Sequence, residues 1–136
     1  MFRTITRWFS DRSGSMVESA ITMPILILLS LAFVNLALAG YASATAQNAA
    51  NYGARVGAMA FSNAAGRALD NARQAAAGGI GSYDIAVSAS DAPGSTVSVT
   101  VNWQVPNFFA GLMPLFGQSA GDLKGAASAS YRKEGW

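Results

Sequence analysis

The hydrophobic residues of the chain change their spacing along the sequence, and the first block is an uninterrupted apolar run. No charged residue occurs between Glu18 and Arg55, and within that interval Ala20 to Tyr41 reads AITMPILILLSLAFVNLALAGY. At 1.5 Å per residue, about 22 helical residues span roughly 33 Å, close to the ~30 Å hydrocarbon core of a bilayer. The run therefore predicts a membrane-spanning helix at about residues 20–41.

The helical pattern continues beyond this run, so one long helix is expected over residues 15–60. From residue 42 onward the sequence is rich in Ala, Gly and Ser, and small residues recur at near-helical spacing. Small residues let helix backbones approach closely. This small-residue stripe predicts close helix packing, either between subunits or against a sheet of the same chain. Its members are Ala42, Ala46, Ala49, Gly53 and Gly57.

A second helix is predicted at residues 63–77, with Asn63 as its N-cap. After Gly81 the hydrophobic spacing changes from the helical period to two, which is typical of β-strands. These elements predict an α+β head over residues 61–136, in which the helices cover one face of a small antiparallel three-stranded sheet. The strands are expected at about 82–90, 96–105 and 123–132, with Trp103 and Tyr131 in the core.

An apolar segment, residues 106–121 (PNFFAGLMPLFGQSAG), separates the second and third expected strands. It is too long for a turn and far more apolar than an ordinary loop. Contiguous apolar patches usually mark a contact with a partner or a membrane, and we expect a partner surface here. A flap folded over the chain's own sheet is the alternative. The patch consists of Phe108, Phe109, Leu112, Met113, Leu115 and Phe116.

Composition narrows the possible functions. Hydrophobic residues make up 51% of the chain and charged residues only 12%, so a sizeable surface must meet lipid or protein. The net charge is +2 and the basic residues are spread out, which argues against nucleic-acid binding. Histidine and cysteine are absent, so the commonest general base, disulfides and thiolate metal sites are excluded. Because the acidic residues form no recognisable paired motif, we expect neither an enzyme nor a bound cofactor or metal.

The charges before the apolar run predict its orientation. Arg3, Arg7 and Arg12 precede it, opposed only by Asp11, so the positive-inside bias places the N-terminus in the cytoplasm and the head outside. A cleaved secretory signal is the alternative, with Ala37-Leu38-Ala39 as a small-x-small exit. The unbroken helical pattern beyond that exit and the carboxylate at the entrance argue against it.

Two residues of this helix predict local features. Glu18 stands at the entrance to the apolar run, where it can form a capping box with Ser15. It can also pair with a cation of a neighbouring chain, because a carboxylate is costly to bury among packed apolar helices without one. Pro24 removes a backbone hydrogen bond inside the helix and predicts a kink.

Three sequence blocks, taken in order, resemble TadE-like proteins of the tight-adherence (Tad) pilus system. They are RSGSMVESAITMPILILLSLAF, AQNAANYGARVGAMA, and VSVTVNWQVP followed by MPLFG and ASASYRKE. The resemblance covers essentially the whole chain. It implies a pilin-like structural subunit of a Tad-type (type IVc) adhesive pilus, either a minor pilin or pseudopilin or a main filament component, which assembles through its N-terminal hydrophobic helix. A membrane-anchored binding module of a secretion or pilus assembly machine, which does not polymerise, is the alternative.

The same resemblance implies processing and partners. Residues 1–14 would be a basic cytoplasmic leader, which a prepilin peptidase would remove between Gly14 and Ser15. Glu18 would then be fourth in the mature chain, where the family tends to have it fifth, so cleavage after Ser13 and retention of the leader stay open. Glu18 would pair with a neighbour's terminal amine. The expected partners are other pilin subunits, the inner-membrane assembly platform with its cytoplasmic ATPase, the prepilin peptidase and lipid. The expected location is the bacterial inner membrane with the head outside, or the extracellular pilus.

Overall fold

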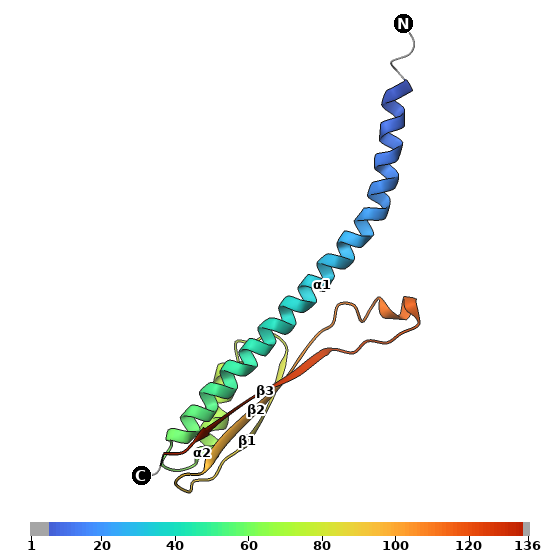
Figure 1. The fold of residues 1–136 in the computed structure, drawn as a ribbon. Coiled ribbons are helices and arrows are strands. Elements are labelled where there is room, and N and C mark those ends of the chain that lie inside the picture. Colours follow the sequence, from blue (N-terminus) through green and yellow to red (C-terminus); the bar gives the residue numbers. More distant parts are fainter. Residues whose placement is uncertain (1–5, 135–136) are drawn as a thin grey trace. The chain divides into compact units, whose positions relative to one another are not determined.

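The computed structural model describes residues 6–134, with the surroundings of the side chains at 16–115 and 117–134, and shows an α+β fold (Figure 1). The long N-terminal apolar helix, the second helix and the antiparallel three-stranded sheet confirm the predicted fold class. The chain divides into two compact units between Val34 and Asn35, so the second unit includes the later part of the long helix. The elements are α1 (Thr6–Met59), α2 (Ala64–Ala76), β1 (Ser82–Ser88), β2 (Thr96–Val105), the short 3-10 helix η1 (Met113–Phe116) and β3 (Leu123–Arg132).

The sheet has β2 at its centre and β1 and β3 at its edges. Both pairs are antiparallel, and Val101 of β2 stands opposite Ile85 of β1 and Ala127 of β3. Because side chains alternate between the faces of a strand, this register gathers the apolar residues of all three strands on one face. β1 ends earlier than predicted, since the Ser95 hydroxyl donates to the Ser90 carbonyl at 2.8 Å and the chain turns there.

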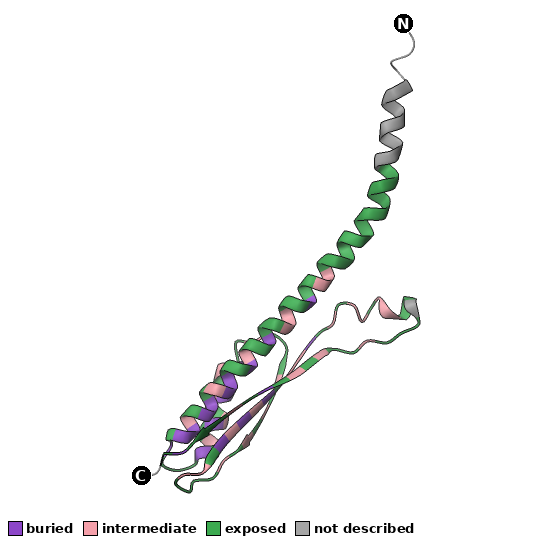
Figure 2. Ribbon diagram, in the orientation of Figure 1, coloured by how far each residue is buried: buried purple, intermediate pink, exposed green. Residues whose placement is uncertain are grey.

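The core lies where α1 and α2 cover the apolar face of the sheet, as the buried residues in Figure 2 show. It consists almost entirely of alanine and valine, with Val97, Val99 and Val101 fully buried in β2. Each alanine buries little apolar area, so stability depends on close approach of the backbones rather than on large side chains. The alanines that α2 contributes are Ala64, Ala68, Ala72 and Ala76.

The two aromatic residues predicted for the core have different environments. Trp103 packs against the core and is partly buried. The prediction for Tyr131 is wrong, because its side chain is 41% exposed. Tyr131 pairs with Val97 near one end of the sheet, and instead of being covered by a helix it lines an open cavity together with Arg55 and Lys133.

Candidate functional site

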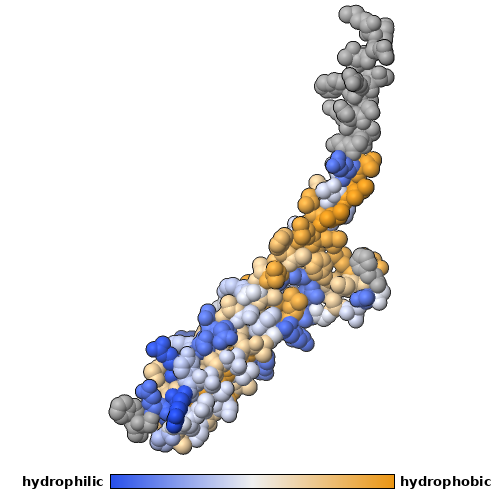
Figure 3. Space-filling model, viewed as in Figure 1, coloured by the Kyte–Doolittle hydropathy of each residue, from blue (hydrophilic) through white to orange (hydrophobic). Residues whose placement is uncertain are grey.

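The first described part of α1 exposes apolar side chains on every side of the helix. Residues 25–29 read ILILL, and each of them is 43–59% exposed. Five consecutive residues of an α-helix pass around its whole circumference. Figure 3 shows this part of the helix as a continuous hydrophobic surface. A helix that is hydrophobic all round is stable only in a core, among other apolar helices or in lipid.

The length and composition of α1 are sufficient for it to cross a membrane, and its most apolar portion is almost entirely exposed rather than packed in a soluble core. Two of its hydroxyl groups bond within the helix, since Thr22 donates to the Glu18 carbonyl at 2.7 Å and Ser30 to the Leu26 carbonyl at 2.8 Å. The helix continues through Pro24, where a kink stays a prediction. This helix is consistent with a membrane anchor.

Glu18 is exposed on α1. Its predicted local role is wrong, because α1 begins at Thr6, so that Ser15 lies well inside the helix and cannot be an N-cap. The surroundings of Gly14 and Ser15, the predicted processing residues, are outside the part of the chain whose side-chain environment the structure describes. Pairing between Glu18 and a neighbour's amine stays a prediction.

The small-residue stripe lies buried inside the second compact unit, residues 35–136, which we call the head from here on. A Cβ atom at Gly53 would come within 2.7 Å of both the Ala68 carbonyl oxygen and the Ala72 Cβ. At Gly57 it would lie 2.8 Å from the Ala68 Cβ and 2.9 Å from Val97 Cγ1. The stripe thus lets α1 approach α2 and β2 of the same chain. All five predicted members are buried there, namely Ala42, Ala46, Ala49, Gly53 and Gly57.

Asn35 fastens residues 106–121, which we call the flap, to α1. Asn35 is buried, with only 7% of its surface exposed, and its amide nitrogen donates to Asn107 Oδ1 at 2.9 Å. Its Oδ1 accepts from the Phe108 backbone N–H at 3.0 Å, and the Asn107 amide nitrogen donates to the Gly121 carbonyl at 3.2 Å. Sequence analysis missed Asn35, although a lone amide in a long apolar run was the available signal.

The flap extends beyond the paired ends of β2 and β3 (Figure 1), and the core contains none of the flap side chains that the structure describes, at 106–115 and 117–121. The alternative prediction of a flap folded over the chain's own sheet is therefore wrong. Phe108 and Leu115 are exposed to 49% and 79%. Phe109, Leu112 and Met113 are half-buried, and the side chain of Phe116 lies outside the described residues. The partner contact of this patch stays a prediction.

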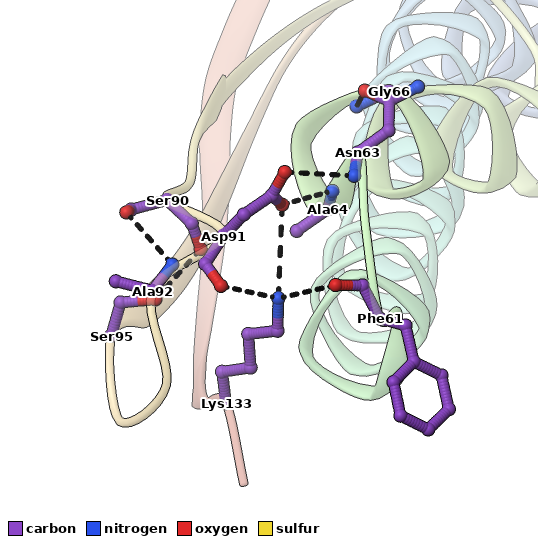
Figure 4. A network of polar contacts seen from close by, with 9 residues as sticks. All are labelled: Phe61, Asn63, Ala64, Gly66, Ser90, Asp91, Ala92, Ser95 and Lys133. Carbon is purple, nitrogen blue, oxygen red and sulfur yellow. Dashed lines mark hydrogen bonds and ion pairs between the residues drawn. The ribbon is translucent and has the colours of Figure 1, made fainter. Parts of the chain in front are cut away.

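A polar network joins the turn between β1 and β2, and the residue that follows β3, to the start of α2 (Figure 4). The Asp91 carboxylate accepts from the backbone N–H groups of Ala64 at 2.8 Å and of Asn63 at 3.0 Å. These two hydrogen bonds, that of Ala64 first, hold the pKa of Asp91 below its ordinary value, and the nearby Lys133 ammonium acts in the same direction. Lys133 is buried, and its Nζ donates to the carbonyls of Asp91 at 2.9 Å and Phe61 at 3.4 Å.

The chemistry available around this network is limited. An open cavity of about 380 Å³ beside it is lined by charges of both signs, including Arg55, Arg132 and Glu134. Within residues 6–134 no three His, Cys, Asp or Glu residues are grouped so that they could hold a metal ion. The network around Asp91 and Lys133 is suited to holding backbone segments together. The larger candidate surface for contact with lipid or protein is the exposed apolar part of α1.

The comparison with known families concerns the same helix. Residues 14–55 match the family described as TadE-like protein. No curated protein and no solved structure matches the chain. The matched segment contains Glu18, the exposed apolar surface and most of the small-residue stripe, and it associates the chain with Tad pilus systems. This segment, which forms most of α1, is similar to TadE-like proteins, and the match confirms the predicted resemblance over residues 14–55.

Proposed function

We propose that the chain is a pilin-like structural subunit of a Tad-type adhesive pilus, without catalytic activity. It is a minor pilin or pseudopilin, or a main filament component. It is stored in the bacterial inner membrane with its N-terminus in the cytoplasm and its head outside. From there it joins other pilin subunits through α1, with the help of the inner-membrane assembly platform and after processing by a prepilin peptidase.

The observation that carries this proposal is that the earlier part of α1 is exposed, whereas its later part is packed into the head. From Ala42 onward its small residues pack into the head, and Ala42, Ala46 and Ala49 are fully buried. Before Asn35 the helix is apolar on all sides and exposed. A surface of this kind can exchange lipid for the helices of other subunits, because helices in a membrane associate through packing rather than through the exclusion of water.

Glu18 provides the test of subunit assembly. Among packed apolar helices its carboxylate needs a cation, and the proposal assigns this role to the terminal amine of a neighbouring subunit. Removing one partner of a buried ion pair costs about 3–5 kcal/mol. Glu18→Gln keeps the size of the side chain and removes its charge. We expect its incorporation into sheared filaments to fall at least about tenfold, while its amount in the membrane fraction is unchanged.

Asp84→Asn is the matched control, because it makes the same change at an exposed acid on β1 in the head. It should enter filaments like the unmodified chain. Normal incorporation of Glu18→Gln would contradict the charge-pairing role. If the unmodified chain were found only in membranes and never in filaments, the alternative of a membrane-anchored binding module would replace the proposal.

A further inference from the structure

We propose that the flap, residues 106–121, enters the outer edge of the lipid bilayer and forms a second membrane contact of this chain. The inference rests on the proposed function, in which α1 is the membrane anchor. It is an alternative to the protein-partner surface that the sequence predicted for the flap, and it is supported by the position, backbone bonding and composition of the flap.

The position follows from Asn35. The predicted span covers about residues 20–41, so Asn35 lies about six residues, or ~9 Å, before its outer end. Its side chain is bonded to Asn107 and to the backbone of Phe108 at 2.9 and 3.0 Å. The base of the flap is therefore bonded to a residue in the last two turns of the span.

Much of the backbone of the flap, from Phe109 to Gln118, is bonded internally, which such a depth favours. A backbone N–H without a partner costs several kcal/mol in hydrocarbon, so irregular segments there need internal bonds. Phe109 N–H donates to Asn107 Oδ1, and Pro114 has no N–H to satisfy. Six further N–H groups of the flap bond to carbonyls of residues 107–114, namely those of Ala110, Leu112, Met113, Leu115, Gly117 and Gln118.

The side chains of the flap complete the fit. No charged residue occurs between Asp91 and Asp122, so the flap can leave water without burying a charge. Phe108 and Leu115 already expose apolar surface, and burying such surface gains ~25 cal/mol per Å². A protein partner would explain the apolar surface, but it would not explain why the flap is fastened to a residue within the predicted span.

The test measures the depth of single labels in the full-length chain. Cysteine is absent from the sequence, so one introduced thiol gives one label. Leu115→Cys reports on the flap, Leu36→Cys on the span, and Ala92→Cys on an exposed loop of the head. Each variant carries an environment-sensitive fluorophore and is placed in vesicles of phosphatidylethanolamine and phosphatidylglycerol, with a quencher on the lipid chains in a parallel sample.

We expect the labels at Leu115 and Leu36 to shift their emission to shorter wavelength and to be quenched by the lipid-bound quencher, whereas the Ala92 label stays in water. Lipid contact at Leu36 with a Leu115 label that resembles Ala92 would overturn the flap insertion and leave the anchor intact. A water-exposed Leu36 label would overturn the anchor and the inference together. A Leu115 label that is shielded only when other pilus proteins are added would assign the flap to a protein partner and overturn the inference.

Discussion

Asp91 is a partly exposed turn residue whose carboxylate caps α2 through the N–H groups of Asn63 and Ala64. Only the ionised form accepts both bonds, which is why the pKa of Asp91 is lowered in the folded chain. As the pH falls, the unfolded chain binds the proton first, in the ordinary Asp range near ~4. The stability that Asp91 contributes is complete above that range, and is lost as the pH falls through the lower folded pKa.

Asp91→Asn should therefore lower the Tm at neutral pH, because an amide replaces the charged cap. Its Tm should also fall less steeply than that of the unmodified chain as the pH is lowered below the ordinary Asp range near ~4, since the linked protonation is gone. Thermal unfolding in detergent, followed by circular dichroism across this range, measures both effects. Asp84→Asn, at an exposed position in β1, is the control and should follow the unmodified chain. Parallel acid profiles for Asp91→Asn and the unmodified chain would refute the assignment.

Single polar residues were the part of the site that the sequence could least predict. Asn35 bonds to a residue 72 positions away, and Asp91 to residues 27 and 28 positions away. Local spacing carries no information about such contacts, because the folded path of the chain brings the groups together. Glu18 was singled out as an unusual charge, and its capping role is wrong because the helix begins at Thr6 rather than near Ser15.

At the scale of elements, the contact between α1 and α2 depends on two glycines. Gly53 has no space for a methyl group, since a Cβ would lie 2.7 Å from the Ala68 carbonyl oxygen, which belongs to the α2 backbone. Gly53→Ala must therefore push the helices apart. We expect a loss of about 1–3 kcal/mol in the free energy of unfolding, measured by denaturant titration in detergent. Gly57→Ala, which meets Val97 and Ala68, should have a loss of the same order.

Gly40→Ala is the matched control for these variants. Gly40 lies in the same helix, and nothing is within 4 Å of the position that a Cβ would occupy. The substitution should leave stability unchanged or raise it by up to about 1 kcal/mol, because alanine is the better helix former. If all three variants behaved alike, the close approach of α1 and α2 would not be the cause of the effect.

The elements themselves were largely predictable, for reasons specific to each. The strict alternation of apolar and polar residues around Val97, Val99 and Val101 predicted the central strand, and the same two-residue period predicted the two edge strands. The small-residue stripe remained ambiguous, because closely packed helices need small residues whether they belong to one chain or two. The flap was recognised as unusual from composition, yet its attachment depended on Asn35 and on bonds that no period encodes.

For the whole molecule, α1 is both the membrane anchor of the proposed function and a structural part of the head. The boundary between the compact units falls at Asn35, inside the predicted span rather than at its end. The head therefore begins within the apolar run and contains the flap, Asn35 and the later part of α1. The second half of α1 supplies Ala46, Ala50 and Ala54 to the core, each fully buried.

This sharing predicts which fragments can fold. A fragment of residues 35–136 keeps the whole alanine and valine core and should unfold cooperatively, as followed by circular dichroism in mild detergent. An alkaline wash should release it from membranes, because it lacks most of the span, whereas the full chain should stay. A fragment of residues 60–136 loses the α1 side of the core and leaves one face of a three-stranded sheet only partly covered, so it should show no cooperative transition. A cooperative transition of the shorter fragment at the same temperature as the longer one would mean that α1 is an anchor alone and contributes nothing to the stability of the head.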